Sequence, residues 1–138
     1  MREIGSKNTK PELLFRKHLF SMGFRYRIND RMIAGSPDIV FPKYHALIFI
    51  HGCFWHGHDC GLFRLPGTNT EFWRKKIDIN RERDANVLNR LRAEGWRICI
   101  VWECSIKGKV QLQKTDATVN QIAEWLKSDS IWLEIKRD

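Results

Sequence analysis

The sequence predicts an α/β fold in which helices cover both faces of a mixed β-sheet. Short apolar segments with the spacing of strands alternate along the chain with longer segments whose apolar residues recur at helical spacing. Their order, a helix, several strands, a helix, a strand and a helix, is typical of one sheet packed between two layers of helices. A length of 138 residues predicts a single domain, residues 1–138, that can bury a substantial core.

The first helix is predicted over residues 11–20. Thr9 can cap its start, and Pro11 suits the first turn, where an N–H group would have no helical partner. Gly23 is placed to end the helix.

Three strands are predicted next. Residues 24–28 alternate apolar and polar side chains, as in a half-buried strand. After a turn-rich link at 31–37, residues 38–41 and 44–50 are expected to pair as a hairpin, with Pro42 stopping the first of them.

The second half of the chain predicts two helices and two strands. A long helix is expected at about residues 71–94, stopped by Gly95. Residues 97–102 predict an apolar, central strand, 117–127 an amphipathic helix and 131–135 a short edge strand. The long helix has one apolar face, formed by Ile77, Val87, Leu88 and Leu91.

The charge balance favours an acidic partner. Lys and Arg number 24 against 16 Asp and Glu, which gives a net charge of +8. Such a surplus suits nucleic acid, and six tryptophans strengthen that interpretation because bases stack on aromatic rings. A merely basic soluble domain is the alternative. No stretch of 18 apolar residues and no apolar signal core occur, so we expect a cytosolic protein without a membrane span.

A structural zinc site is predicted around residues 51–60, which hold three of the five histidines and two of the four cysteines. If strands 44–50 and 97–102 lie side by side, both open at the same edge of the sheet. Three thiolates and one imidazole could then complete a closed tetrahedral shell: Cys53, His58, Cys60 and Cys104. The alternative is free thiols and surface histidines. Cys99, inside an apolar strand, is expected to be a small buried hydrophobe.

A second group of residues predicts phosphodiester cleavage. Asp38, after Pro37, begins one strand, and the next strand ends at Ile50 and His51. Many nucleases carry Pro-Asp on one strand and an acidic residue, a spacer and a Lys on the next; the Asp binds Mg²⁺, which activates water and offsets charge on the phosphate. Here Ile50 takes the acidic position and His51 the Lys position. The main-chain carbonyl of Ile50, a hard oxygen, is therefore the candidate second ligand.

Three further residues could assist this centre. Glu12, on the first helix, could hold a water on the metal, and His56 could act as general acid or base near neutral pH. Asp84, on the long helix, could orient His56 through the other ring nitrogen. Structural alternatives exist: Glu12 as an acid favoured by the helix dipole, and Asp84 as a solvated helix charge.

Aromatic side chains are candidates for insertion between bases. Phe54 and Trp55 are adjacent and hard to bury together on one face, and Trp73 follows Phe72 at the start of the long helix. Such wedges unstack a base step, and the free-energy cost of unstacking is lowest where the base pair is mismatched. The alternative is that one of the adjacent pair packs inward. Residues that could contact phosphates or a base edge follow on the helix: Lys75, Lys76, Asn80, Arg81 and Arg83.

The segment 49–56, with His58 and Cys60, resembles the signature of the very-short-patch-repair (Vsr) mismatch endonucleases. Further matching segments occur in the same order and spacing: Pro37-Asp38 and residues 70–73, 82–84 and 95–104. The similarity covers nearly the whole chain up to Trp125. The motif is long and mixed, which makes a chance match improbable.

The resemblance implies a restriction-endonuclease-like three-layer sandwich with a structural zinc. It implies Mg²⁺-dependent nicking of one strand of double-stranded DNA, 5′ to the thymine of a T:G mismatch left by deamination of 5-methylcytosine. Asp38 and the Ile50 carbonyl are then the Mg²⁺ ligands, and Glu12 supports bound water. His51 and His56 serve the reacting phosphate, with Asp84 supporting His56.

The same resemblance assigns residues to recognition of the mismatch. Phe54, Trp55 and Trp73 are implied to insert beside it from the major groove. Lys76 and Asn80 match positions that touch it.

Two departures from the family pattern bear on activity. The family often has Thr at the position of Ile50, so a carbonyl ligand survives but any hydroxyl role is lost. Family members usually carry an additional basic stretch before the position of Pro11 that helps to grip DNA, and we expect weaker binding without it.

Two other functions remain as alternatives. One is a Vsr-like restriction or defence nuclease, or nickase, that needs no mismatch. The other is a zinc-stabilised DNA-binding module without catalysis. We expect a monomer, with mismatch-repair proteins or a repair polymerase as candidate partners.

Overall fold

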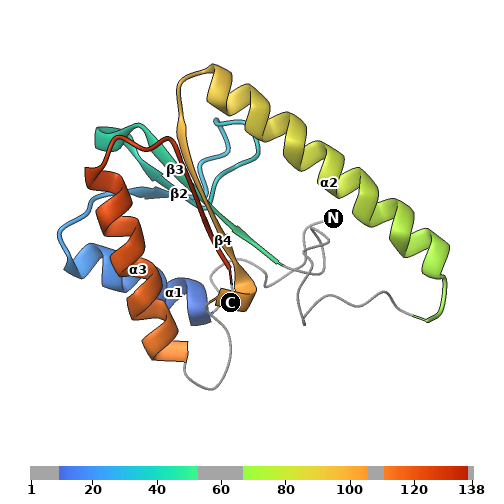
Figure 1. Cartoon of the computed structure of the whole chain (residues 1–138), viewed down its shortest axis with the longest axis horizontal. Helices are drawn as coiled ribbons and strands as arrows, with labels where there is room; N and C mark the ends of the chain where they lie inside the picture. The colour runs from blue at the N-terminus through green and yellow to red at the C-terminus, as the bar shows by residue number, and fades with distance from the viewer. Residues whose placement is uncertain (1–9, 53–66, 106–110, 137–138) are drawn as a thin grey trace.

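The structure is a computed structural model, and it describes residues 10–52, 67–105 and 111–136. Its centre is a five-stranded sheet in the order β1-β2-β3-β4-β5 (Figure 1). The strands are β1 Arg27–Ile28, β2 Ile39–Phe41, β3 Ala46–His51, β4 Arg97–Trp102 and β5 Trp132–Ile135. Neighbouring strands from β1 to β3 are antiparallel, and those from β3 to β5 are parallel, so the predicted mixed sheet is confirmed.

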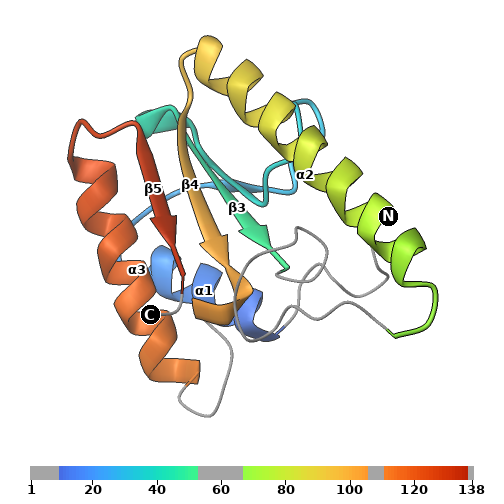
Figure 2. The same ribbon diagram turned by 45° about the vertical axis from the view of Figure 1, so that its right-hand side comes forward.

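Helices cover both faces of this sheet. Helices α1 (Lys10–Ser21) and α3 (Gln111–Lys127) lie on one face, and α2 (Thr70–Ala93) lies on the other (Figure 2). Short 3₁₀ turns follow β2 and β4: η1 (Pro42–Tyr44) and η2 (Glu103–Ser105). The three-layer arrangement predicted from the order of elements is therefore confirmed.

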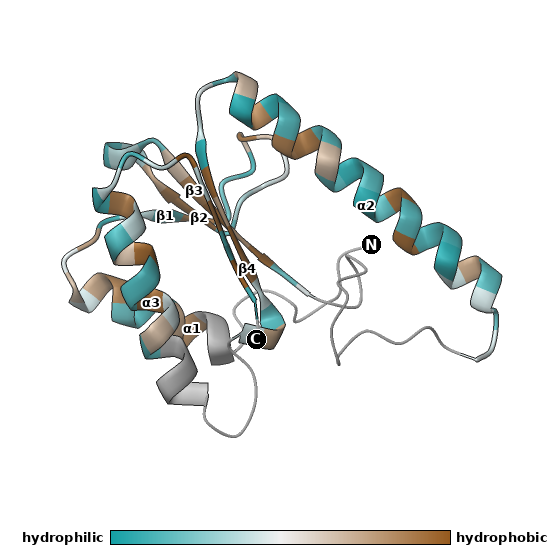
Figure 3. Ribbon diagram, in the orientation of Figure 1, coloured by the Kyte–Doolittle hydropathy of each residue, from teal (hydrophilic) through white to brown (hydrophobic). Residues whose placement is uncertain are grey.

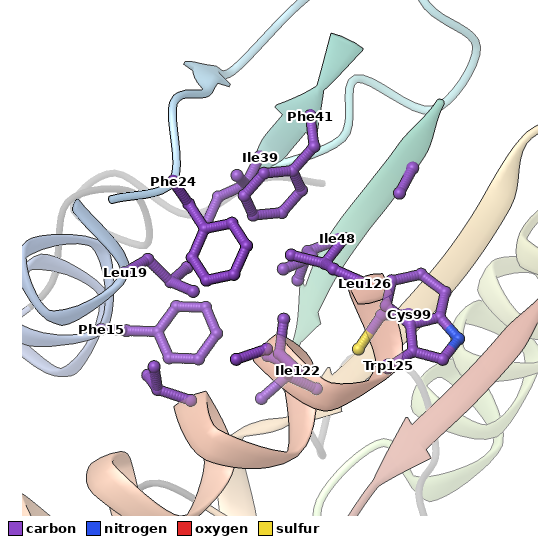
Figure 4. Close-up of a cluster of buried hydrophobic side chains, with 14 of the residues drawn as sticks. Phe15, Leu19, Phe24, Ile39, Phe41, Ile48, Cys99, Ile122, Trp125 and Leu126 are labelled. Carbon is purple, nitrogen blue, oxygen red and sulfur yellow. The ribbon is translucent and has the colours of Figure 1, made fainter. Parts of the chain in front are cut away.

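Side chains alternate between the two faces along each interior strand, as the pleat requires. Ile48 and Cys99 face the α1/α3 layer, where they meet Phe15 of α1 and Ile122 of α3 in the larger core (Figure 4). On the opposite face a smaller core packs against α2, with Leu91 fully buried. Its strand residues are Val40, Leu47, Phe49, Ile98 and Ile100.

Only one end of α2 belongs to that smaller core. Three residues near the C-terminal end of α2 pack on the sheet: Val87, Leu88 and Leu91. The N-terminal part of the helix extends away from the strands (Figure 1). Most of the residues along α2 are hydrophilic (Figure 3). A basic helix that projects past the edge of a sheet is well placed to reach a large ligand.

Most predicted boundaries agree with the structure. Gly23 and Gly95 follow α1 and α2 with positive φ values of 96° and 91°, a region that glycine enters without a Cβ clash. Pro42 ends β2, and β2 and β3 form the predicted antiparallel hairpin with Ile39 opposite Ile48. Strand β5 lies at the edge of the sheet, as predicted.

Two elements differ from their predicted extents. The strand predicted over 24–28 is reduced to Arg27–Ile28, because the N–H of Phe24 donates to the carbonyl of Leu19 and so belongs to the end of α1. Helix α3 begins at Gln111 rather than 117, because its first turns are too polar to show a helical apolar pattern. Within the described residues, no helix is both long and apolar enough to cross a bilayer.

Candidate active site

Asp38 is held on both sides by the backbone although it lies just before β2. Its N–H donates to the carbonyl of Ile48 at 3.0 Å, and its own carbonyl accepts from the N–H of Asn29 at 3.0 Å. These bonds extend the ladder between β1, β2 and β3 by one residue. The position of the Asp38 side chain is therefore set by the sheet rather than by the loop before it.

The carboxylate of Asp38 reaches the end of β3. Its Oδ2 atom accepts a hydrogen bond from the N–H of Ile50 at 2.6 Å. A charged acceptor makes such a bond short and strong. Asp38 is 7% exposed, so this carboxylate is drawn against the peptide of Ile50 inside the protein rather than in open solvent.

His51 ends β3 and is packed between aromatic rings. It is 8% exposed, and its ring centroid lies 5.8 Å from that of Phe49 and 5.1 Å from that of Trp102. The Trp102 ring meets it edge to face, at an interplanar angle of 74°. The imidazole therefore has a defined place beside Asp38 on the α2 face of the sheet.

These side chains open into a pocket of about 140 Å³ between the sheet and α2. Asp38 and His51 line it from the sheet, and Arg83 and Asp84 line it from the helix. The remaining lining residues are Gly35, Ser36, Phe49, Ile50, Val87 and Leu88. Two carboxylates, a guanidinium and an imidazole thus converge on a cavity whose remaining lining is mostly apolar, which is typical of a catalytic or binding site.

Asp84 reaches the pocket because its position on α2 places it on the side of the helix that faces the sheet. It precedes Val87 and Leu88 by three and four residues, so it lies on the same side of the helix as the residues that pack on the sheet. The half-buried position of Asp84 in the pocket disfavours its interpretation as a simple solvated helix charge.

The loop before Asp38 closes the pocket through Gly35. Its φ is +78°, and a Cβ built on it would lie 2.7 Å from Cγ1 of Val87 and 3.2 Å from Cε1 of Phe49. Only glycine fits so close to α2 in that conformation. The next residue, Ser36, also has a positive φ, of 49°, and lines the pocket.

Sequence reasoning missed part of this lining. Ser36 was not predicted, because its placement follows from two consecutive positive φ values that the residue types alone do not reveal. Arg83 was placed only among the phosphate contacts of the helix, whereas it lines the same pocket as Asp38. The spacing of Arg83 from Val87, four residues, was the available signal.

Other predicted site residues lie partly or wholly outside the described part of the chain. Glu12 lies in the first turn of α1, and its side chain is outside that part. His56 is outside it entirely, as are Phe54 and Trp55.

The predicted recognition residues of α2 are described. Trp73 is half-buried, and its ring centroid lies 5.2 Å from that of Phe72, which is 57% exposed. Lys76 and Asn80 are half-buried one and two turns further along the helix.

Of the predicted zinc ligands, only Cys104 is described. It is fully buried in η2, two residues past Trp102, which pairs in parallel register with His51. Strands β3 and β4 therefore end together at one edge of the sheet, as the zinc prediction requires. Cys53, His58 and Cys60 lie outside the described residues, and within those residues no group of three or more His, Cys, Asp or Glu side chains could hold a metal.

The remaining cysteine, Cys99, is a core residue, as predicted. It is fully buried in the α1/α3 core, and burial raises the pKa of its thiol far above the ordinary value. A thiol in that environment is inert toward metals and electrophiles.

Comparisons with known proteins identify relatives over most of the chain. A family model described as DNA mismatch endonuclease Vsr matches residues 1–62. The type II nicking enzyme V.NmeAIP of Neisseria meningitidis serogroup A is 51% identical over 109 residues, which are 79% of this chain and 78% of that protein. The type II nicking enzyme V.XorIIP of Xanthomonas oryzae pv. oryzae is 45% identical, over 77% of this chain and 78% of its own length.

The DNA mismatch endonuclease Vsr of Escherichia coli K12 is 42% identical over 126 residues. That alignment covers 91% of this chain and 80% of the relative. The chain therefore belongs to the Vsr family of DNA mismatch endonucleases.

Proposed function

We propose that this protein is a DNA endonuclease that nicks one strand of a duplex, 5′ to the thymine of a T:G mismatch, in a reaction that requires Mg²⁺. The family and the names of the relatives support an endonuclease. The observation that carries the proposed chemistry is the buried carboxylate of Asp38, bonded to the N–H of Ile50 inside a pocket that Asp84 and Arg83 also line.

The pocket has the donors that a hard cation prefers. Asp38 contributes a carboxylate, and its hydrogen bond to the N–H of Ile50 fixes it beside a residue whose own main-chain carbonyl is a second hard oxygen of the kind that binds Mg²⁺. Asp84 adds a second negative charge to the same cavity, and a cation there offsets the repulsion between the two carboxylates. Asp38 and the carbonyl of Ile50 are the proposed ligands, and Glu12 is the proposed support for bound water.

When bound, Mg²⁺ supplies an activated water and offsets negative charge on the scissile phosphate. The chain's own residues bind and orient that phosphate. Arg83 carries a permanent positive charge at the pocket, and its guanidinium matches the geometry of two phosphate oxygens. His51, held between Phe49 and Trp102, presents its imidazole to the same phosphate.

His56 is the proposed general acid or base. An imidazole titrates near neutral pH and can pass a proton to or from the reacting oxygen. Asp84 is proposed to accept a hydrogen bond from the other ring nitrogen of His56, which fixes the tautomer and orientation of that ring. The place of Asp84 in the pocket of Asp38 supports this pairing.

Recognition of the mismatch is assigned to aromatic and helical residues. Phe54, Trp55 and Trp73 are proposed to enter the base stack beside the mismatch, where unstacking costs least. Lys76 and Asn80, on the part of α2 that projects past the sheet, are proposed to touch the mismatched bases. The partner is double-stranded DNA, and the protein is proposed to act as a monomer.

A structural zinc is proposed at the edge where β3 and β4 end. Cys104 is buried there, and it is joined in the proposal by Cys53, His58 and Cys60. Four such ligands form a closed shell that stabilises the chain around it and performs no chemistry.

The test is incubation with Mg²⁺ and end-labelled duplexes that carry T:G or T:A at one position, over varied flanking sequences. We expect a single nick 5′ to the T of the T:G duplex, no nick in the T:A duplex, and no nick with EDTA. Equal nicking of both duplexes would replace the proposal with a nuclease that needs no mismatch. Binding without any nick would indicate a DNA-binding module.

A further inference from the structure

Three side chains from three neighbouring strands form a row on the α2 face of the sheet. His51 of β3 and Trp102 of β4 are direct partners across the parallel pair, so their side chains share a face. Glu134 of β5 is the partner of Ile100. Because Ile100 precedes Trp102 by two residues on β4, their side chains share a face, and Glu134 lies on that face as well. The row runs from the active-site pocket to the edge strand.

Each neighbouring pair in the row makes a contact that has a defined geometry. The Nε1–H of Trp102 donates to Oε2 of Glu134 at 2.6 Å. The indole of Trp102 meets the ring of His51 edge to face, with centroids 5.1 Å apart. A carboxylate acceptor makes the indole hydrogen bond stronger than a neutral one does.

Exposure falls along the row toward the pocket. Glu134 is exposed, Trp102 is half-buried, and His51 is 8% exposed. The indole thus forms the wall that covers the imidazole on the side of β5, and Phe49 covers it within β3. A tryptophan side chain has two rotatable torsions, and the bond to Glu134 restricts the rotation of the indole about them.

We infer that Glu134 is a positioning residue for the nicking reaction: it fixes the indole of Trp102, which in turn holds the imidazole of His51 at the pocket. The inference rests on the proposed function, because it takes His51 to serve the reacting phosphate. Glu134 is not among the residues that line the pocket, so its contribution passes through Trp102, to which it is hydrogen-bonded. Edge strand β5 thereby acquires a role in catalysis.

The test uses variants of the full-length protein: Glu134→Ala, Trp102→Phe, the double variant, and Glu134→Gln, whose side-chain oxygen can still accept the indole N–H. Glu124→Ala, an exposed acid on α3, is the matched control. Single-turnover and steady-state nicking of the T:G duplex separate kcat from KM. Two-dimensional NMR of the free protein reports the Trp102 indole N–H and the contacts between the protons of Trp102 and His51.

We expect Glu134→Ala and Trp102→Phe each to lower kcat about tenfold with KM unchanged, as a small misplacement of a reacting group does. The double variant should lose no more than either single variant, because both changes break one bond. Glu134→Gln should retain most of kcat, and Glu124→Ala all of it. In Glu134→Ala the indole N–H signal should shift and its contacts to His51 should weaken.

The inference is overturned if Glu134→Ala leaves kcat and the NMR contacts unchanged, or if the double variant shows the product of two independent losses. Either result leaves nicking by the unaltered protein, and with it the proposed function, intact. If the unaltered protein nicked no duplex, the proposed function would fail instead. The NMR comparison would then decide alone whether Glu134 and Trp102 place His51.

Discussion

The carboxylate of Asp38 and the N–H of Ile50 are joined by a hydrogen bond of 2.6 Å that crosses from the start of β2 to the end of β3. The bond ties an acidic side chain to the main chain of Ile50, the residue whose own carbonyl is the second proposed metal ligand. Asp38 is held by backbone hydrogen bonds to the sheet, and Ile50 pairs with Val101 of β4, so we expect the site to need little rearrangement to receive a cation.

Substitution of Asp38 should remove activity without unfolding the protein. Asp38→Asn keeps the size and an acceptor for the Ile50 N–H but lacks the negative charge. We expect Asp38→Asn to lose about 4 kcal/mol of transition-state stabilisation, which corresponds to a nicking rate about a thousandfold lower. Single-turnover nicking measures this loss, and circular dichroism checks the fold. Nicking at the unaltered rate would show that Asp38 is not a ligand.

Asp84 and Asp78 provide a matched pair on α2. Asp84 lines the pocket, whereas Asp78 is exposed on the same helix. Asp84→Ala should lower kcat about 10- to 100-fold, as loss of a residue that orients a catalytic histidine does. Asp78→Ala should leave kcat within twofold of the unaltered value, about the precision of the assay. Equal effects of the two substitutions would contradict the pairing of Asp84 with His56.

Gly35 tests whether the loop before Asp38 must lie against α2. Gly35→Ala places a Cβ 2.7 Å from Cγ1 of Val87 at a φ of +78°. Gly23→Ala is the control, because its φ is +96° and nothing lies within 4 Å of the added Cβ. We expect Gly23→Ala to lower the free energy of unfolding by about 1 kcal/mol through backbone strain. Gly35→Ala should cost about 1–3 kcal/mol more through overpacking.

The Gly35→Ala substitution should also reduce nicking, because a shift of the loop at Gly35 would displace Asp38, which follows it by three residues in the chain. Urea unfolding measures the stabilities, and the T:G nicking assay measures the activity. The same loss of stability in both glycine variants would show that contact with Val87 is unimportant.

Substitutions of Cys104 and Cys99 compare a proposed zinc ligand with a cysteine of the hydrophobic core. If zinc is bound as proposed, the purified protein carries about one zinc per chain. Cys104→Ser should lower that content and the melting temperature, whereas Cys99→Ala should retain the metal. Elemental analysis of dialysed protein measures zinc. Full zinc content in Cys104→Ser would exclude Cys104 from the ligand set.

The projecting part of α2 should make DNA binding depend on salt. Lys75 is exposed on that segment, and Lys43 is exposed on η1, at the opposite end of β3 from His51. Lys75→Ala should reduce the slope of log K against log salt by about 1, which corresponds to one lost phosphate contact. Lys43→Ala should leave the slope unchanged. Fluorescence anisotropy over a salt series gives both slopes, and identical slopes would place the DNA elsewhere.

The fold was largely predictable because its signals are local. The apolar run of β4 and the helical spacing of Val87, Leu88 and Leu91 each follow from neighbours along the chain. Gly95 marks the end of α2 for the same reason. Strand β1 was overestimated, because the apolar Phe24 joins the core from the end of α1 rather than from a strand.

The site was predictable only in part. Asp38 and His51 stand out because they flank apolar strands, but the place of Ser36 depends on backbone conformation beside Gly35. The row from His51 to Glu134 depends on parallel pairing between strands distant in sequence, and no local pattern encodes that register. Residue types therefore predicted the chemistry of the candidate site, and tertiary pairing supplied further residues beside it.

The central claim is that a divalent cation binds between the carboxylate of Asp38 and the carbonyl oxygen of Ile50. Anomalous scattering from crystals of the protein with T:G duplex DNA and Mn²⁺ tests it most directly. We predict an anomalous peak at about 2.0–2.3 Å from both oxygens, the range expected for a hard cation on oxygen ligands. A peak bound elsewhere, or no peak at this position with DNA in place, would contradict the account.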